Sequence, residues 1–221
     1  MPRPLVRIRI HTTNTMADAD AYCGARLALA RKHFGEYSND GNGLSDEART
    51  AYGFAFRSIA LKYVESGRMD AGWTYLSKSI ALCPGLLGDL NTFYEVACGD
   101  QTRGTRGQVQ GLDLAANSEE LLRRLDALFA SADAPAQALR STAYGKAHLA
   151  LAMLADQAGD WSAARGYLLE AIRFDPGLLR DRNVLRRFAK VMAGQRLTGV
   201  AKQIVGRESS SEGFRPHTPP E

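Results

Sequence analysis

Residues 51–87 read AYGFAFRSIALKYVESGRMDAGWTYLSKSIALCPGLL, and residues 143–179 read AYGKAHLALAMLADQAGDWSAARGYLLEAIRFDPGLL. The second stretch follows the first at a constant offset of 92 residues, without a gap. Both open on Ala-Tyr-Gly and close on Pro-Gly-Leu-Leu, and both carry a central glycine, Gly67 and Gly159. The agreement in residues, and in the positions of the glycines and prolines that break helices, indicates an internal repeat.

Each copy has the pattern of two helices joined by a tight turn. In the first copy, Phe56, Ile59 and Tyr63 recur at the spacing of one helical face. Gly67 ends that helix, and the second helix ends before Pro84 because proline cannot continue a helix interior. A hairpin of this kind cannot bury its apolar face alone and must stack on neighbours. The sequence therefore predicts an all-α fold of stacked helical hairpins.

The second copy carries a Leu-Ala pair at 151–152, a Gly-Asp turn at 159–160, and Pro176 at the end. With these residues both copies resemble tetratricopeptide (TPR) repeats, and the resemblance implies a TPR-like array. It says little about function, because such hairpins are generic scaffolds. His148 takes the place of Phe56 on the apolar face, and we expect it to be a packing residue.

The segments outside the two copies are assigned from caps, glycines and composition. We expect one helix over 16–35, closed by Gly35, and another that starts at Asn117 as N-cap and runs to about Ser131. The segment between the two copies is not a clean repeat, because 92 is not a multiple of the roughly 34-residue TPR period. The expected organisation is a short extended segment over 1–16, a helical domain over 17–207 and a disordered tail over 208–221.

Composition excludes several classes of protein. No run of 18 apolar residues is present, so no transmembrane helix is expected. The N-terminus lacks the apolar region of a secretory signal. Cys23, Cys83 and Cys98 are scattered without a CxxC spacing, which indicates neither a disulfide framework nor a zinc site. We expect a cytoplasmic protein.

Two motifs resemble known metal-binding or catalytic motifs, but the sequence around each of them does not fit that role. Asp18-Ala19-Asp20 spells the D-x-D pattern of many nucleotide-sugar transferases, but it lies where a helix begins, and acidic residues there favour the helix dipole. The turn at 38–43 is similar to a calcium loop, but Arg49 stands where a bidentate glutamate is needed. The sequence predicts no complete active site in this chain.

The stretch PLVRIRIH, residues 4–11, alternates apolar residues at 6, 8 and 10 with polar residues at 7, 9 and 11. This is the pattern of a half-buried strand. The backbone groups of a strand need partners, and the rest of the chain is predicted to be helical. We therefore expect the strand to be the last piece of a sheet whose other strands lie outside this chain.

Pro4-Leu5-Val6-Arg7, Arg9, His11 and Asn14 resemble the closing segment of the catalytic GT-A domain of family 2 glycosyltransferases. The chain departs from that pattern at Ile8, where tyrosine is usual, and at Met16, where serine is usual. A bacterial subset of the family continues with a linker helix, TPR-like pairs that close in Pro-x-Leu-Leu, and a basic segment. The resemblance in the order of motifs covers residues 4–207.

The resemblance implies that the chain is the C-terminal helical module of such a transferase, without its catalytic domain. It implies a scaffold or interaction role and no catalysis by this chain alone. No cofactor is expected here. A divalent metal belongs only to a complete parent enzyme, where His11 would complete the metal shell. The partner would be a glycosyltransferase catalytic domain or another protein. The alternative is a free-standing TPR-type adaptor that binds a peptide.

Positive charge gathers near the C-terminus, although the net charge of the whole chain is only +4. We expect a basic helix there that contacts anionic lipid at the periphery of the inner membrane. The alternative is a solvated helix that caps the array. Nucleic acid is not an expected partner, because interleaved aromatic residues and a recognised binding fold are both missing. The basic side chains in question are Arg186, Arg187, Lys190, Arg196 and Lys202.

Overall fold

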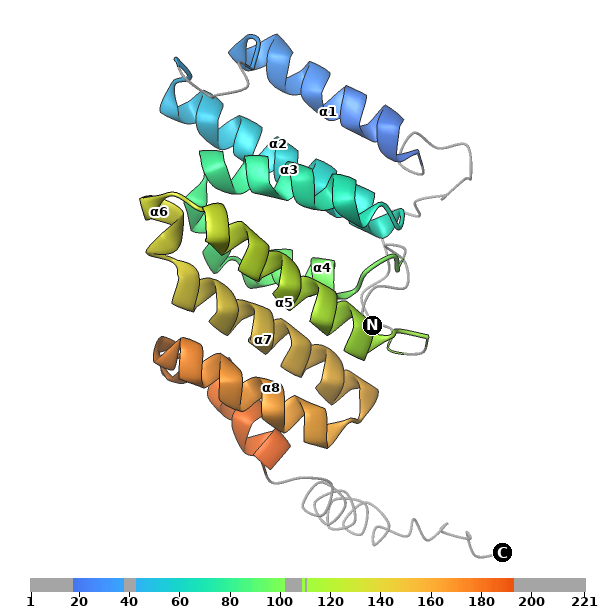
Figure 1. Ribbon diagram of the computed structural model, residues 1–221, viewed down its shortest axis with the longest axis vertical. Helices are drawn as coiled ribbons and strands as arrows, with labels where there is room; N and C mark the ends of the chain where they lie inside the picture. The colour runs from blue at the N-terminus through green and yellow to red at the C-terminus, as the bar shows by residue number, and fades with distance from the viewer. Residues whose placement is uncertain (1–17, 38–42, 102–108, 110, 193–221) are drawn as a thin grey trace, which may run out of the picture.

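The computed structural model describes residues 18–37, 43–101, 109 and 111–192, and within these ranges it contains helices and no strand. Figure 1 shows the helices stacked along the long axis of the molecule. The stack begins with α1 (Ala19–Phe34) and ends with α8 (Trp161–Phe174) and a final helix over 182–192. The predicted all-α fold of stacked helical hairpins is confirmed.

The two copies of the repeat form two hairpins, each followed by a 3-10 turn on Pro-Gly-Leu-Leu and by another helix. Gly67 and Gly159 occupy the hairpin turns with positive φ angles of 76° and 75°, a backbone region that favours glycine. The elements of the first copy are α2 (Asp46–Glu65), α3 (Met69–Leu82), η1 (Pro84–Gly88) and α4 (Leu90–Ala97); those of the second are α7 (Arg140–Ala158), α8, η2 (Pro176–Arg180) and the helix over 182–192.

Between the hairpins lie α5 (Leu114–Ser131) and the short α6 (Ala134–Gln137). The prediction that Asn117 caps α5 is wrong. Asp113 is the N-cap, and its carboxylate accepts a hydrogen bond from the backbone N–H of Ala116 at 3.0 Å. Asn117 instead donates from Nδ2 to the carbonyl of Ala97 at 3.0 Å. The side chain therefore ties α5 to α4, a tertiary contact that local sequence does not reveal.

The repeat unit is larger than one hairpin. α1 packs on α2 as α5 packs on α7, and each starts after a capping aspartate, Asp18 or Asp113. At the other end of the unit, α4 and the helix over 182–192 follow Asp89 and Asp181, which lie 92 residues apart. Apart from the short α6 and the 3-10 turns, the described helices thus form two modules of four, and the unit spans more than one TPR period. Module 1 is α1–α4, and module 2 is α5, α7, α8 and the helix over 182–192.

A glycine in the first helix of each hairpin lets the end of the second helix approach closely. A Cβ added to Gly145 would lie 2.5 Å from Cβ of Asp175, and one added to Gly53 would lie 2.5 Å from Sγ of Cys83. Contacts that short do not occur between real atoms, so a side chain at either position would force its neighbour to move. The tight approach is a property of the repeat, because Gly53 and Gly145 are equivalent residues.

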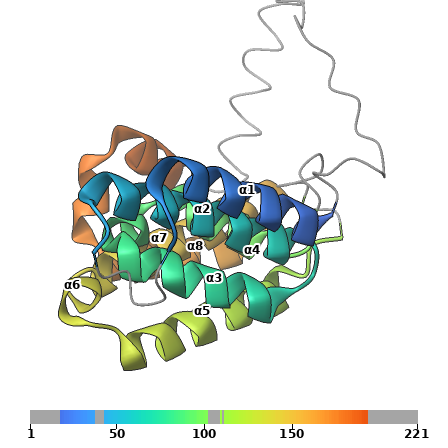
Figure 2. The same cartoon turned by 90° about the horizontal axis from the view of Figure 1, so that it is seen from above.

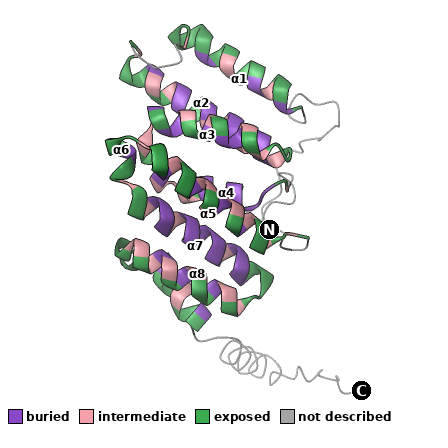
Figure 3. Ribbon diagram, in the orientation of Figure 1, coloured by how far each residue is buried: buried purple, intermediate pink, exposed green. Residues whose placement is uncertain are grey.

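The two modules share one core. Phe93 and Val96 of α4 belong to the same apolar cluster as Ala143 and Ala147 of α7, and α4 contacts both α5 and α7. α7 is buried along most of its length, whereas the helices at the two ends of the stack expose much of their surface (Figure 3). In the view down the stack, α5 lies on the opposite side from α1 (Figure 2), so module 2 is rotated relative to module 1.

Gly145→Ala is expected to destabilise the protein. The new Cβ would meet Asp175 at its Cβ and, at 3.3 Å, the carbonyl oxygen of Ala171; overpacking of this kind costs about 1–3 kcal/mol. That exceeds the roughly 1 kcal/mol that alanine gains over glycine in a helix. The matched control is Gly166→Ala in α8, where nothing lies within 4 Å. Urea unfolding should show a lower free energy of unfolding for Gly145→Ala and a higher one for Gly166→Ala; an increase in both would contradict the close approach.

Candidate functional site

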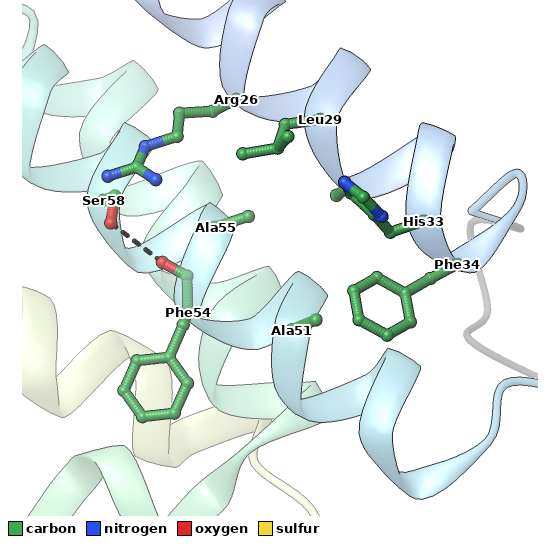
Figure 4. Close-up of a pocket in the computed structure, with 9 residues that line it drawn as sticks. Arg26, Leu29, His33, Phe34, Ala51, Phe54, Ala55 and Ser58 are labelled. Atoms are coloured by element: carbon green, nitrogen blue, oxygen red, sulfur yellow. Dashed lines mark hydrogen bonds between the residues drawn. The ribbon is translucent and has the colours of Figure 1, made fainter.

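A groove of about 440 Å³ lies between α1 and α2, at the first end of the stack. Figure 4 shows Arg26 and Leu29 reaching from α1 toward α2, with the Phe34 ring beside Ala51. The two helices lie antiparallel along the groove, because the last turn of α1 faces the first half of α2. The lining residues are Arg26, Leu29, Ala30, His33, Phe34, Ala51, Phe54, Ala55 and Ser58.

Three large apolar side chains are exposed around this groove. Leu29 is 51% exposed, Phe34 41% and Phe54 52%. Exposed apolar groups that gather at one place on a surface mark an interaction site. The polar residues of the lining are Arg26, His33 and Ser58, and none of the lining residues is a carboxylate. Arg26 donates from Nε to the hydroxyl of Tyr22 at 3.0 Å, which holds the guanidinium at the groove. The arrangement can bind an apolar surface.

Sequence reasoning missed this groove. Two features could have pointed to it. Phe54 lies off the buried face of α2, and its equivalent in the second copy is Lys146, so a large apolar residue stands where the repeat elsewhere has a charge. Phe34 is the last residue of α1 and lies next to Gly35, which ends the helix with a positive φ of 79°. Neither feature indicates a groove until the antiparallel packing of α1 on α2 is known.

The residues predicted as sites fall in different places. His11 lies outside the residues that the structure describes, as do Arg196 and Lys202. Arg186 is exposed on the helix over 182–192. The metal role of His11 and the lipid contact of the basic helix stay predictions. The residues of the described ranges contain no group of three or more histidine, cysteine, aspartate or glutamate side chains that could hold a metal ion.

Arg187 and Lys190 bind a buried carboxylate of the same chain. Asp156 of α7 accepts from Nη1 of Arg187 at 2.8 Å and from Nζ of Lys190 at 2.9 Å. The ammonium group of Lys190 also lies 5.2 Å from the ring centroid of Trp161. Two of the cations predicted to form a basic surface therefore fix the last helix to α7. The equivalence of Asp156 with Val64 could have pointed to this contact, since a carboxylate replaces an apolar residue of the repeat.

Both aspartates of the D-x-D pattern accept hydrogen bonds from other groups of the same chain. The carboxylate of Asp18 caps α1 by accepting from the backbone N–H groups of Asp20 and Ala21. The carboxylate of Asp20 accepts from the hydroxyl of Tyr63 and from Nη1 of Arg68, each at 2.7 Å. The hydrogen bond from Arg68 holds the pKa of Asp20 below its usual value. The expectation that these acidic residues serve the start of a helix is confirmed for Asp18.

Cys23 is buried beside this cluster, and burial raises the pKa of its thiol. The pKa of Tyr63 is raised as well, first by its hydrogen bond with Cys23 and then by burial. Tyr144 of module 2 donates its hydroxyl to Asp126. Its pKa is raised to about 12, first by burial and then by that carboxylate. These groups are held in their uncharged forms at neutral pH, and they link the helices on which they lie.

His148 is a packing residue, as predicted. It is buried in α7, and its ring stacks on Phe174 with 5.5 Å between centroids and 8° between planes. Burial lowers the pKa of His148, against a smaller opposite effect from Glu170. Its Nδ1 has no hydrogen-bond partner within the described ranges. Phe56 is the equivalent residue in module 1, so a neutral ring is what this position of the repeat requires.

Comparisons of the chain with protein-family models, with curated proteins and with solved structures found no significant match. Among the residues that the structure describes, none of the helices is both long and apolar enough to cross a membrane.

His148→Phe is expected to stabilise the protein and to flatten its pH dependence. It removes a buried nitrogen without a partner, which costs about 1–3 kcal/mol. In the wild type the folded-state pKa of His148 lies below the unfolded value of about 6.5. The unfolded state therefore binds the proton more readily, and stability falls as the pH drops below about 6.5. Urea unfolding between pH 5 and pH 8 measures both effects.

The control is His148→Gln, which cannot take up the proton but keeps a polar side chain in the core. It should lose the same part of the pH dependence without the gain in stability at pH 7. Equal slopes for the wild type and both variants below pH 6.5 would show that His148 is not held neutral by its burial.

Proposed function

We propose that this chain is a helical scaffold and interaction module of the kind that follows the catalytic domain of a family 2 glycosyltransferase. The order of motifs over residues 4–207 supports the family, because the sequence predicts an extended segment, a linker helix, two TPR-like hairpins and a basic segment in the order of that resemblance. The chain would hold or place other proteins and would not transfer a sugar alone.

The observation that carries the scaffold role is the groove between α1 and α2. Its exposed apolar side chains, Leu29, Phe34 and Phe54, lie at one end of a rigid stack of hairpins. Two polar groups of the groove make hydrogen bonds within the fold: Arg26 donates to the hydroxyl of Tyr22, and Ser58 donates to the carbonyl of Phe54. An end face of this kind suits contact with another protein surface better than turnover of a small substrate.

A free-standing adaptor is the second candidate, and the same groove favours it. Such an adaptor needs no catalytic domain, only an apolar surface with a few polar groups that fix the register of a partner. The cationic Arg26 at the rim would supply such a group. The two candidates use the same surface. They differ in whether a catalytic domain is encoded upstream of this chain or in a neighbouring gene.

The genomic DNA upstream of the codon for Met1 separates the two. The proposal predicts that the reading frame, or a neighbouring gene, encodes a catalytic domain in which a D-x-D motif follows a strand. The purified chain should release no nucleoside diphosphate from nucleotide sugars, with or without added manganese or magnesium.

Two results would contradict the proposal in different ways. Unrelated sequence upstream, with a separate ribosome-binding site and no transferase gene beside it, would favour the adaptor. Metal-dependent hydrolysis of a nucleotide sugar by the purified chain would show a catalytic site within these 221 residues and would remove the scaffold role.

A further inference from the structure

At the junction between the two modules, an apolar surface of module 1 packs into a depression on module 2. We call the first surface the knob and the second the socket. The knob is the apolar side of η1 and α4 in module 1, with Leu87, Phe93 and Val96. The socket is the face of α5 and α7 in module 2, and both helices contact α4. Small residues form the floor of the socket, so the short helix can lie close to α7. The floor residues are Ala143, Ala147 and Ala150, each fully buried.

The groove between α1 and α2 is the same socket in module 1. Its floor residues Ala51, Ala55 and Ser58 are the equivalents of Ala143, Ala147 and Ala150 at the offset of 92. On the other wall, alignment of the capping aspartates Asp18 and Asp113 makes Phe34 equivalent to Phe129. Phe129 is 2% exposed beneath its neighbours, whereas Phe34 is 41% exposed. Module 1 therefore presents an unfilled copy of the socket.

The last helix of module 2 presents the matching knob. Leu179 of η2 is the equivalent of Leu87, and Leu185 is the equivalent of Phe93. Leu87 and Phe93 are 0% and 1% exposed in the internal junction, but Leu179 and Leu185 are 41% and 43% exposed. Phe188, the equivalent of Val96, is half-buried against the apolar cluster of module 2. Two of the three residues that fill the socket inside the molecule thus have uncovered equivalents, among the described residues, at its far end.

We propose that the groove between α1 and α2 binds η2 and the helix over 182–192 of a second copy of this chain, head to tail, in the geometry of the internal junction. The inference rests on the proposed scaffold role and names the occupant of its surface. One molecule carries both halves of a contact that the same fold already makes internally, and this continuity selects a second copy over an unrelated partner.

The polar rim of the internal junction has an ionic counterpart in the proposed contact. Tyr94 of α4 donates its hydroxyl to Oε1 of Gln157 at 3.1 Å. The equivalent residues are Arg186 on the knob and Glu65 at the socket, a pair of opposite charge. Glu65 already pairs with Lys62 at 3.3 Å, and Arg186 would join that pair. Arg26 at the groove adds a like charge, so the apolar side chains must supply most of the attraction.

A head-to-tail contact uses two different surfaces of the molecule, so each added copy leaves one knob and one socket open. The products are open chains of molecules, or rings where the rotation closes. This property makes the proposal testable by complementation. A molecule with a damaged knob and a molecule with a damaged socket can form one contact together, although neither can associate with itself.

Sedimentation equilibrium on the full chain tests the proposal. For the wild type, the average mass should rise above that of the monomer between about 1 µM and about 500 µM, within the wide range of affinities that protein interfaces cover. Leu185→Glu, which damages the knob, and Ala55→Glu, which damages the socket, should each stay monomeric. Their equimolar mixture should reach a dimer and stop there. Leu169→Glu changes a side chain that is equally exposed but outside the knob, and it should associate like the wild type.

Circular dichroism and thermal unfolding establish that each variant is folded. Leu29→Glu is a second socket variant at a more exposed position, for use if Ala55→Glu is unfolded. A photo-reactive residue in place of Phe54 identifies the occupant, since mixed heavy and light chains separate links between molecules from links within one. The expected link joins position 54 to residues 176–192 of another copy.

Three results would overturn the proposal. A wild-type chain that is monomeric at every concentration has no such contact. Association that survives Leu185→Glu and Ala55→Glu uses another surface. A link from position 54 to residues 1–17 or 193–221 of the same molecule shows that the chain fills its own groove. None of these results bears on nucleotide sugars or on the upstream DNA, so the family proposal stands or falls separately.

Discussion

The fold depends on one packing constraint: a short helix must lie against an alanine face. Ala143 and Ala147 leave room on α7 for Phe93 and Val96 of α4, and this contact joins two modules into one core. Larger residues on α7 would push α4 away and expose the apolar face of each module. Glycine plays the same part within a hairpin, where Gly145 lets the end of α8 approach α7.

Equivalent positions of the two modules show how one geometry tolerates different chemistry. Arg57 of α2 donates to Asp89 at 2.7 Å and to Thr92 at 2.5 Å, which fixes the start of α4. In module 2 the equivalents of Arg57 and Thr92 are Leu149 and Val184, and both belong to one apolar cluster. The contact between the first helix of the hairpin and the last helix of the module is therefore a hydrogen-bonded ion pair in module 1 and an apolar pair in module 2. The last helix of module 2 has its ion pair at another point, with the buried carboxylate of Asp156, whereas the Arg57–Asp89 pair of module 1 is half-buried.

The sequence predicts the hairpins well and the joints between them poorly. Periodic apolar residues predict the two helices of the hairpin, and Gly67 and Pro84 mark the ends of α2 and α3, because these signals are local. The sequence favours Asn117 as the cap of α5, because nothing local shows that its side chain bonds to α4 instead. The groove and the partner of Lys190 were missed for the same reason: each is made by residues far apart in sequence.

α4 of module 1 completes the core of module 2. Hydrogen exchange on Phe93→Ala tests this packing, because the lost ring belongs to α4 but fills the socket of module 2, and the cavity costs about 3–5 kcal/mol. Exchange should become faster in α7 over 140–154 as well as in α4. Faster exchange confined to residues 90–97, with α7 unchanged, would contradict it.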